Sequence, residues 1–221
     1  MKKILLISDS TAYPRSKSLG EETIYEKTYP YLLKIKYKNF EISNICFGGI
    51  STNQLFNQAI SYYKEWNPDI VIINSGINDC RTFPISDRLI QIISLCSIKL
   101  YNVIEKLLFK DFIQKNFSKP NTSLKKFKKI ISRFEIIFDQ SKIIWIEIVA
   151  DKSYDQVRYN TSKYLNEYNN LLFNKFDKNF IKVKDDIIQN NGIQKDGFHL
   201  NERGHNVIYN KLIHTIENII S

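Results

Sequence analysis

The sequence predicts an α/β protein: a doubly wound, three-layer sandwich in which helices cover a central, mostly parallel five-stranded sheet. Two observations predict it. Short apolar runs of strand length alternate with longer segments of helical periodicity along the 221 residues. The runs contain few polar residues, which indicates strands buried on both faces, as in a parallel sheet between helices. One domain, 1–221, is sufficient for a chain of this length.

Five apolar runs are the predicted strands, of which the last is shorter and weaker than the others. They lie at Lys3–Ser8, Glu41–Phe47, Asp69–Asn74, Lys142–Ala150 and Asn179–Lys184. Helical periodicity predicts three helices, at Thr52–Trp66, Tyr159–Phe176 and Glu202–Ile219. Pro68 ends the first of these helices, and Asn201 is the expected N-cap of the last.

One segment, about 81–140, interrupts this alternation. More residues separate the third and fourth strands than a single crossover helix requires. The pattern there predicts at least two helices, near Ser86–Phe117 and Ser123–Asp139, separated by Ser118–Asn121. We expect a helical insertion or lid over the carboxyl ends of the strands, and not a separate domain.

The positive charge of the protein is concentrated in this insertion. The chain has a formal net charge of +9, and residues 81–140 alone hold twelve Lys or Arg and five Asp or Glu. A solvated, lysine-rich helix face explains this bias, and a docking surface for an anionic partner is the alternative. Phe127 and Phe134 lie among the lysines at helical spacing, so we expect them in the core and not on a surface that stacks bases.

No export signal and no membrane span are predicted. The apolar run that follows Met1-Lys2-Lys3 ends before Ser8, which makes it shorter than the roughly 7–15 residues of a signal-peptide core. No window approaches ~18 apolar residues. Cys46, Cys80 and Cys96 are an odd number without C-x-x-C spacing, which argues against a disulfide framework and a zinc site. We therefore expect a cytoplasmic protein.

Polar loops follow the first three predicted strands, and another precedes the last helix. In open α/β sheets, ligands bind beyond the carboxyl ends of the strands. These loops would therefore meet at one edge of the sheet. The residues in them that could support chemistry are Ser10, Gly48, Gly49, Asn78, Asp196 and His199.

Ser10, at the end of the first strand, is a candidate nucleophile that would need a base. His214 lies within the last predicted helix and His205 in its first turn, so we expect structural roles for both. His199 lies on an irregular loop three residues after Asp196. This spacing allows the carboxylate to hold Nδ1–H of His199 while Nε2 accepts the proton of Ser10.

Nucleophilic attack on a carbonyl also requires hydrogen-bond donors for the oxyanion. The backbone N–H groups of Ser10 and Gly49 and the side-chain amide of Asn78 could converge on one point. Each stretch alone is a weak signal, because Asp-Ser, Gly-Gly and Asn-Asp pairs are common in turns. Four such stretches in order, each at the expected end of an element, favour an acyl-transfer site.

The four stretches, "SDST", "GGIST", "GIND" and "DGFH", resemble the sequence blocks of the SGNH/GDSL hydrolases. The resemblance extends from Ile4 through the terminal helix and is weakest in the insertion. It implies that Ser10 is the nucleophile, that Gly49 and Asn78 are oxyanion donors, and that Asp196 orients the base His199. It also implies hydrolysis of acyl esters, commonly O-acetyl groups on sugars, without a metal or organic cofactor.

The chain departs from the family pattern at Ser8, where a glycine usually precedes the aspartate. Asp9 is expected to bind neighbouring loops by hydrogen bonds. The stretch "DSTAYPR" also resembles family members from bacterial polysaccharide gene clusters. Arg15 could bind a substrate carboxylate or phosphate, or it could form a structural ion pair.

Three functions are compatible with the sequence. The leading hypothesis is a serine esterase that removes O-acetyl groups from a carbohydrate or another small ester. The same residues would serve an O-acyltransferase if a sugar hydroxyl, in place of water, accepted the acyl group. The third is a non-catalytic protein that binds an anionic partner through the basic insertion, although nucleic acid is not the expected partner.

Overall fold

A parallel five-stranded sheet forms the centre of the computed structural model, which describes residues 1–85, 104 and 111–220. The strand order is β2–β1–β3–β6–β7, and every neighbouring pair is parallel. The strands are β1 (Lys3–Ser8), β2 (Glu41–Cys46), β3 (Ile70–Asn74), β6 (Lys142–Ile146) and β7 (Phe180–Ile181). The predicted α/β class with a central five-stranded parallel sheet is confirmed.

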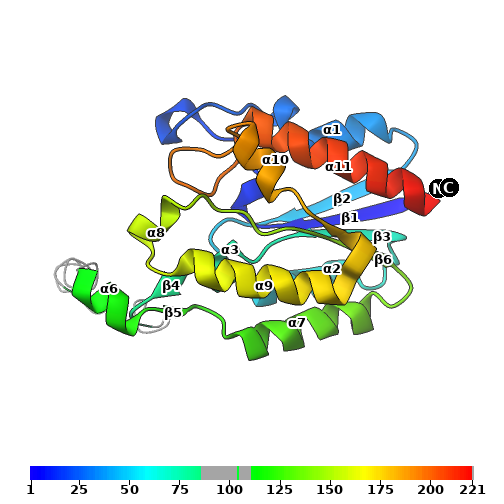
Figure 1. Cartoon of the computed structure of the whole chain (residues 1–221). Coiled ribbons are helices and arrows are strands. Elements are labelled where there is room, and N and C mark those ends of the chain that lie inside the picture. The colour runs from blue at the N-terminus through cyan, green and yellow to red at the C-terminus, as the bar shows by residue number, and fades with distance from the viewer. Residues whose placement is uncertain (86–103, 105–110, 221) are drawn as a thin grey trace.

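Helices cover both faces of the sheet (Figure 1). One layer contains α1 (Tyr29–Lys36), α10 (Lys184–Gln189) and α11 (Glu202–Ile220). The other contains α2 (Thr52–Tyr63), α7 (Leu124–Ile137) and α9 (Thr161–Phe176). Short α3 (Ile77–Cys80) and α8 (Tyr154–Val157) follow β3 and β6, and 3-10 turns occur at Ser10–Ala12, Lys17–Leu19, Tyr25–Lys27 and Asp177–Asn179. In the described part of the chain, no helix has the length and apolarity needed to cross a membrane.

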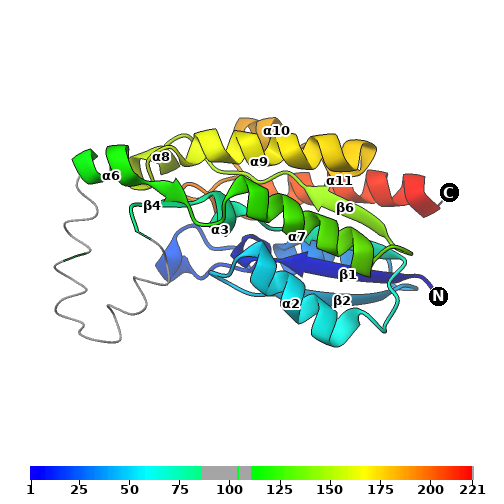
Figure 2. The same ribbon diagram turned by 90° about the horizontal axis from the view of Figure 1, so that it is seen from below.

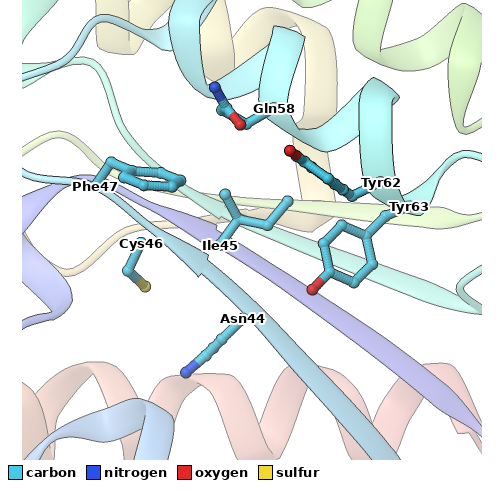
Figure 3. Close-up of a pocket in the computed structure, with 7 residues that line it drawn as sticks. All are labelled: Asn44, Ile45, Cys46, Phe47, Gln58, Tyr62 and Tyr63. Carbon is cyan, nitrogen blue, oxygen red and sulfur yellow. The ribbon is translucent and has the colours of Figure 1, made fainter.

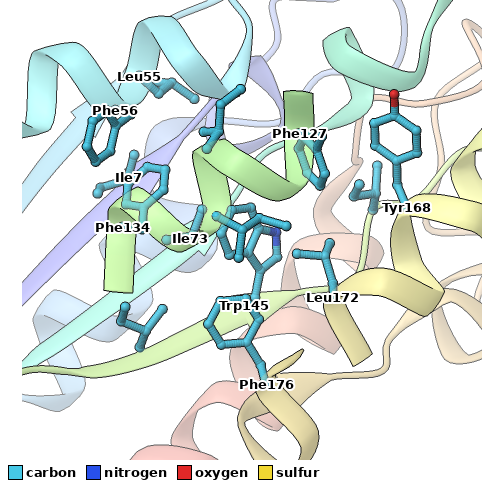
Figure 4. Close-up of a cluster of buried hydrophobic side chains, with 14 of the residues drawn as sticks. Ile7, Leu55, Phe56, Ile73, Phe127, Phe134, Trp145, Tyr168, Leu172 and Phe176 are labelled. Atoms are coloured by element: carbon cyan, nitrogen blue, oxygen red, sulfur yellow. The ribbon is translucent and has the colours of Figure 1, made fainter. Parts of the chain in front are cut away.

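Strands β1, β3 and β6 are buried on both faces, as their apolar runs predicted, whereas the edge strand β2 is only partly buried. Leu5 and Ile7 of β1 belong to the core beneath α2, α7 and α9. Ile4 and Leu6 belong to the core beneath α1 and α11. Figure 4 shows the first core around Trp145, which is fully buried and has ring contacts with Phe127, Phe134 and Phe176.

Helix α7 is the crossover helix between β3 and β6. Figure 2 shows it between α2 and α9 on one face of the sheet. Its buried stripe consists of Phe127, Ile130, Ile131 and Phe134. This stripe is buried against the sheet, so α7 covers a face of the sheet. The prediction that this helix lies over the carboxyl ends of the strands, as part of a lid, is therefore wrong. The basic side chains of α7 are exposed: Lys125, Lys126, Lys128, Lys129 and Arg133.

The chain departs from the sheet layers through β4 (Thr82–Phe83) and returns through β5 (Lys119–Pro120), which pair antiparallel. Helix α6 (Asp111–Phe117) precedes β5. The first helix of the predicted insertion falls largely on 86–103 and 105–110, outside the described residues. A lid formed by this segment therefore stays a prediction.

Strands β6 and β7 are shorter than the predicted Lys142–Ala150 and Asn179–Lys184. The N–H of Glu147 still donates to the Ile181 carbonyl of β7 at 3.0 Å, but at Ile148 the backbone has a side-chain partner in place of a strand. The N–H of Ile148 donates to Oδ1 of Asn169 at 2.9 Å, and Nδ2 of Asn169 donates back to the carbonyl of Ile148 at 2.9 Å. A side chain that substitutes for a neighbouring strand cannot be seen in the apolar pattern of the strand itself.

A close backbone contact between Gly204 and Gly192 sets where α11 begins. A Cβ added to Gly204 would lie 2.2 Å from the Gly192 carbonyl oxygen, which accepts a hydrogen bond from the N–H of Asn201 at 3.0 Å. We therefore expect Gly204→Ala to lower the free energy of unfolding by about 1–3 kcal/mol, despite the better helix propensity of alanine. Urea unfolding measures this. Gly48→Ala, where the added Cβ has contacts of 3.6 and 3.7 Å, is the control, and equal stability of both variants would contradict the packing.

Candidate active site

Three strands end at the same level at the carboxyl edge of the sheet. Ser8 of β1 pairs with Cys46 of β2 on one side and with Asn74 of β3 on the other. The loops that follow therefore begin side by side. They carry Ser10, the Gly48-Gly49 turn and Asn78. The strand order places them at the point where ligands bind in doubly wound sheets.

The backbone on both sides of Ser10 is held by buried hydrogen bonds. The hydroxyl of Ser8 donates to the Asn74 carbonyl at 3.0 Å, so a serine is accommodated where the family pattern has glycine. Oδ1 of Asp9 accepts hydrogen bonds from the N–H of Thr11 at 3.0 Å and from its hydroxyl at 2.8 Å. Asp9 therefore caps the 3-10 turn that Ser10 begins, and the Ser10 side chain is half-buried.

Ser10, His199 and Asp196 form a continuous hydrogen-bonded chain. Oγ of Ser10 lies 2.9 Å from Nε2 of His199, and Nδ1 of His199 lies 2.7 Å from Oδ2 of Asp196. The backbone N–H groups of Phe198 and His199 donate to Oδ1 of Asp196 at 3.3 and 3.1 Å. An imidazole held between a carboxylate and a hydroxyl is able to take the serine proton during attack on a carbonyl.

The ionisation of Asp196 determines which groups donate and which accept in this series of hydrogen bonds. Partial burial raises the pKa of Asp196, but hydrogen bonds from the side chain and backbone of His199 outweigh burial and bring the pKa to about 2. The carboxylate is therefore ionised at neutral pH and can only accept hydrogen bonds. Nδ1 of neutral His199 then carries the proton, and Nε2 is left as the acceptor for Ser10.

The loop that carries His199 is fixed from several sides. The N–H of Gln194 donates to the His199 carbonyl at 2.8 Å, and Ile193 and Leu200 form an antiparallel bridge. The side chain of Gln194 binds the backbone of Glu21, accepting from its N–H at 2.8 Å and donating to its carbonyl at 2.7 Å. Oδ1 of Asn201 accepts from the N–H of Gly204 at 3.2 Å, which makes Asn201 the expected cap of α11.

Arg15 contacts both Asp196 and His199. Its guanidinium donates to Oδ2 of Asp196 at 2.9 Å, and a second guanidinium nitrogen lies 3.4 Å from Nε2 of His199. The backbone of Arg15 pairs with that of Thr23 in an isolated antiparallel bridge. Arg15 thus forms an ion pair within the site, and its contact with a substrate stays a prediction.

The residues predicted to bind an oxyanion differ in their surroundings. Asn78 is 4% exposed, and its Nδ2 has no hydrogen-bond partner among the described residues. A buried donor left without a partner costs about 1–3 kcal/mol, and this one is available to a ligand. Gly49 has φ +74°, which favours glycine, and it is exposed. Gly48 lies close to Ser10, since a Cβ added to it would be 3.6 Å from Cβ of Ser10.

Asp79 and Thr52, for which the sequence predicted no role, join the loops of Gly49 and Asn78. Oδ2 of Asp79 accepts from the N–H of Thr52 at 2.8 Å and from its hydroxyl at 2.6 Å. The Thr52 hydroxyl also lies 2.6 Å from Oγ of Ser75. Burial raises the pKa of Asp79. Both residues lie within the conspicuous polar stretches, but the sequence does not show which side chains of those stretches bind one another.

The other two histidines are residues of α11, as expected. His205 is fully buried, burial lowers its pKa to about 4, and its Nδ1 accepts from the N–H of Tyr29 at 3.4 Å. His214 is exposed, and its Nε2 lies 3.4 Å from Nδ2 of Asn218. Within the described ranges, no group of three or more His, Cys, Asp or Glu side chains is arranged to hold a metal ion.

Comparison of the sequence with protein-family models and with curated proteins finds no match. Solved structures do match. A lipase/acylhydrolase from Enterococcus faecalis has a TM-score of 0.67 at 17% identity, with 99% of this chain and 96% of that chain covered. A catalytic mutant of an acetylxylan esterase from Geobacillus stearothermophilus has a TM-score of 0.64 at 14% identity, with 97% and 94% covered. A lipolytic G-D-S-L family member from Veillonella parvula has a TM-score of 0.61 at 12% identity, with 97% of each chain covered.

Asp9 makes the stability of the protein depend on pH. Burial raises its pKa from 3.8 to about 6, although hydrogen bonds from Thr11 oppose the shift. The folded protein therefore binds more protons than the unfolded chain between about pH 4 and 6, and its stability falls as pH rises through that window. Asp9→Asn keeps an acceptor for Thr11 and removes the titration. Relative to the parent, its free energy of unfolding should rise by up to ~3 kcal/mol from pH 4 to pH 7.

Urea unfolding at several pH values measures this difference. Asp69→Asn is the control, because a hydrogen bond from the N–H of Lys3 lowers the pKa of Asp69. The stability that ionised Asp69 contributes is lost only below about pH 4. The free energy of unfolding of Asp69→Asn should therefore differ from that of the parent by a constant amount from pH 4 to 7. A flat difference for Asp9→Asn as well would contradict the buried, proton-binding carboxylate.

Proposed function

We propose that this chain, whose fold is that of the SGNH/GDSL hydrolases, is a serine esterase in which Ser10 is the nucleophile. The observation that supports this most strongly is the pair of hydrogen bonds, 2.9 and 2.7 Å long, that links Ser10 through His199 to Asp196. The unpaired, buried amide of Asn78 supports it independently, because an acyl-transfer site needs a donor that the folded chain does not use.

In the proposed reaction, Nε2 of His199 removes the proton of Ser10 as Oγ attacks the ester carbonyl. Asp196 holds Nδ1–H of His199 and stabilises the imidazolium that forms. The carbonyl oxygen becomes an oxyanion, which accepts hydrogen bonds from the backbone N–H groups of Ser10 and Gly49 and from Asn78. The alcohol then departs with the proton from His199, and water, deprotonated by the same imidazole, releases the acid.

We propose O-acetyl esters of a carbohydrate as the substrate class. One of the matching structures is named as an acetylxylan esterase, which supports this class by similarity of fold. The resemblance of "DSTAYPR" to family members from polysaccharide gene clusters points in the same direction. The proposed chemistry uses only side-chain and backbone groups of the chain and water, so no cofactor is part of it.

The nucleophile is tested by Ser10→Ala. We expect hydrolysis of p-nitrophenyl acetate to fall by at least about 10³-fold, because the attacking oxygen is gone. The melting temperature should change by no more than a few degrees, since the Ser10 side chain is only half-buried. His199→Ala should cost a similar factor, and the double variant should be no slower than either. Hydrolysis by Ser10→Ala at the parent's rate would refute the proposal.

The oxyanion donor is tested by Asn78→Ala. We expect kcat to fall by about 10²–10³-fold with little change in KM, because the donor acts on charge that develops in the transition state. The free energy of unfolding should not fall by more than about 1 kcal/mol, because no hydrogen bond of the folded chain is lost. Asn121→Ala is the control, since Nδ2 of Asn121 donates to the backbone carbonyl of Asn78, at 3.2 Å, and not to its side chain. An unchanged kcat in Asn78→Ala would remove this residue from the site.

A further inference from the structure

A pocket lies at the edge of the sheet, between β2 and α2 (Figure 3). Residues 44–47 of β2 and the following loop line it, together with Gln58, Tyr62 and Tyr63 of α2. We call it the β2-edge pocket. Its volume is about 440 Å³, within the ~300–1,000 Å³ of small-molecule sites.

The lining combines aromatic rings with an amide around an apolar floor. Figure 3 shows Phe47, Gln58, Tyr62 and Tyr63 around Ile45, which is buried in the core. Gln58 and Tyr62 are four residues apart on α2 and so share one face of the helix. Tyr62 is 73% exposed and Phe47 is 45% exposed. A hydrogen bond from Oγ of Ser43 to the hydroxyl of Tyr63, 2.8 Å long, holds the Tyr63 side chain in place.

The chemistry of the lining selects a neutral ligand with both apolar and hydroxyl faces. None of the described residues that line the pocket has a charged side chain, and burial raises the pKa of the Cys46 thiol to about 12. Exposed tyrosine and phenylalanine rings pack on the C–H face of a sugar ring. Amide side chains donate to and accept from its hydroxyl groups. Among the described lining residues, a phosphate or carboxylate would find no cation.

The pocket is continuous along the chain with the loop beside Ser10. Phe47, at one end of the pocket, directly precedes Gly48. Gly48 in turn lies against Ser10, since a Cβ added to it would be 3.6 Å from Cβ of Ser10. The N–H of Phe47 donates to the Ser8 carbonyl at 3.1 Å. The hydroxyl of Tyr13, three residues after Ser10, donates to the Cys46 carbonyl. One end of the pocket is therefore tied directly to the segment that carries the nucleophile.

We propose that the β2-edge pocket binds a neutral sugar ring of the glycan whose ester is presented to Ser10. This inference rests on the proposed function and adds a binding site for the part of the substrate that does not react. Phe47 and Tyr62 pack on the ring, and Gln58 binds its hydroxyls. The pocket then contributes affinity for an oligosaccharide ester, whereas a small ester that reaches only Ser10 does not use it.

The proposal is tested with Tyr62→Ala, Tyr62→Phe and Gln58→Ala on two substrates, O-acetylated xylotetraose and p-nitrophenyl acetate. For the oligosaccharide, we expect KM to rise about 10-fold in Tyr62→Ala, the loss of about one stacking contact, and several-fold in Gln58→Ala. Tyr62→Phe keeps the ring and should stay within about 2-fold of the parent. For p-nitrophenyl acetate, kcat/KM should be unchanged in all three. Ile136→Ala, an equally exposed truncation on α7 (71% exposed), is the control and should change neither substrate.

A direct binding measurement separates failure of the pocket from failure of the proposed reaction. Calorimetric titration of Ser10→Ala with unacetylated xylotetraose, cellotetraose and mannotetraose needs no turnover. Binding of at least one, weakened about 10-fold by adding Tyr62→Ala, supports the pocket even if no ester is hydrolysed. Binding of none, or equal binding with and without Tyr62, overturns it. The protein could also dimerise through the β2 edge. If it does, and if Tyr62→Ala abolishes the dimer, a second copy of the chain occupies the pocket and the proposal is overturned.

Discussion

The shared register of three parallel strands is the constraint on which the candidate site depends. Ser8 of β1 is level with Cys46 of β2 and Asn74 of β3, so three loops begin at one edge. A shift of one residue in β1 would turn every side chain of the strand to the opposite face. The burial of β1 on both faces resists such a shift, since its alternate residues fill two separate cores. The hydrogen bond from Ser10 to His199, 189 residues away, requires this edge to be in place.

Buried polar groups hold these loops, and most of them are paired. Asp9 caps its turn through Thr11, and Asp79 ties the turn after β2 to α3 through Thr52. In both aspartates burial raises the pKa, so the loops are positioned by carboxylates that are costly to ionise. The Nδ2 of Asn78 has no partner in the part of the chain that the structure describes. Nε of Arg15 and Oδ1 of Asp79 also lack a partner there, but Asn78 is the residue predicted to serve as a side-chain oxyanion donor, which a preorganised oxyanion site would require.

The sequence predicted those features that a local pattern specifies. β1 matches its prediction and β3 differs by one residue, because strands buried on both faces appear as continuous apolar runs. The loops with Ser10 and Asn78 were found for the same reason, since each is a polar stretch at the end of such a strand, and the loop with His199 was found because it precedes a clearly periodic helix. Features that depend on a partner were missed. The apolar residues of α7 recur with helical periodicity, but that periodicity does not show which surface they pack against. The hydrogen bond from Thr52 to Asp79 joins two distant loops, and the sequence does not show that these two side chains meet.

Covalent labelling of the nucleophile tests the central claim most directly. After incubation with diethyl p-nitrophenyl phosphate, mass spectrometry of the tryptic peptide at residues 4–15 should show one diethylphosphoryl group, which fragmentation assigns to Ser10. His199→Ala should remain unlabelled, because the base that activates the hydroxyl is missing. Labelling at another serine, or no labelling of the parent protein, would contradict the account.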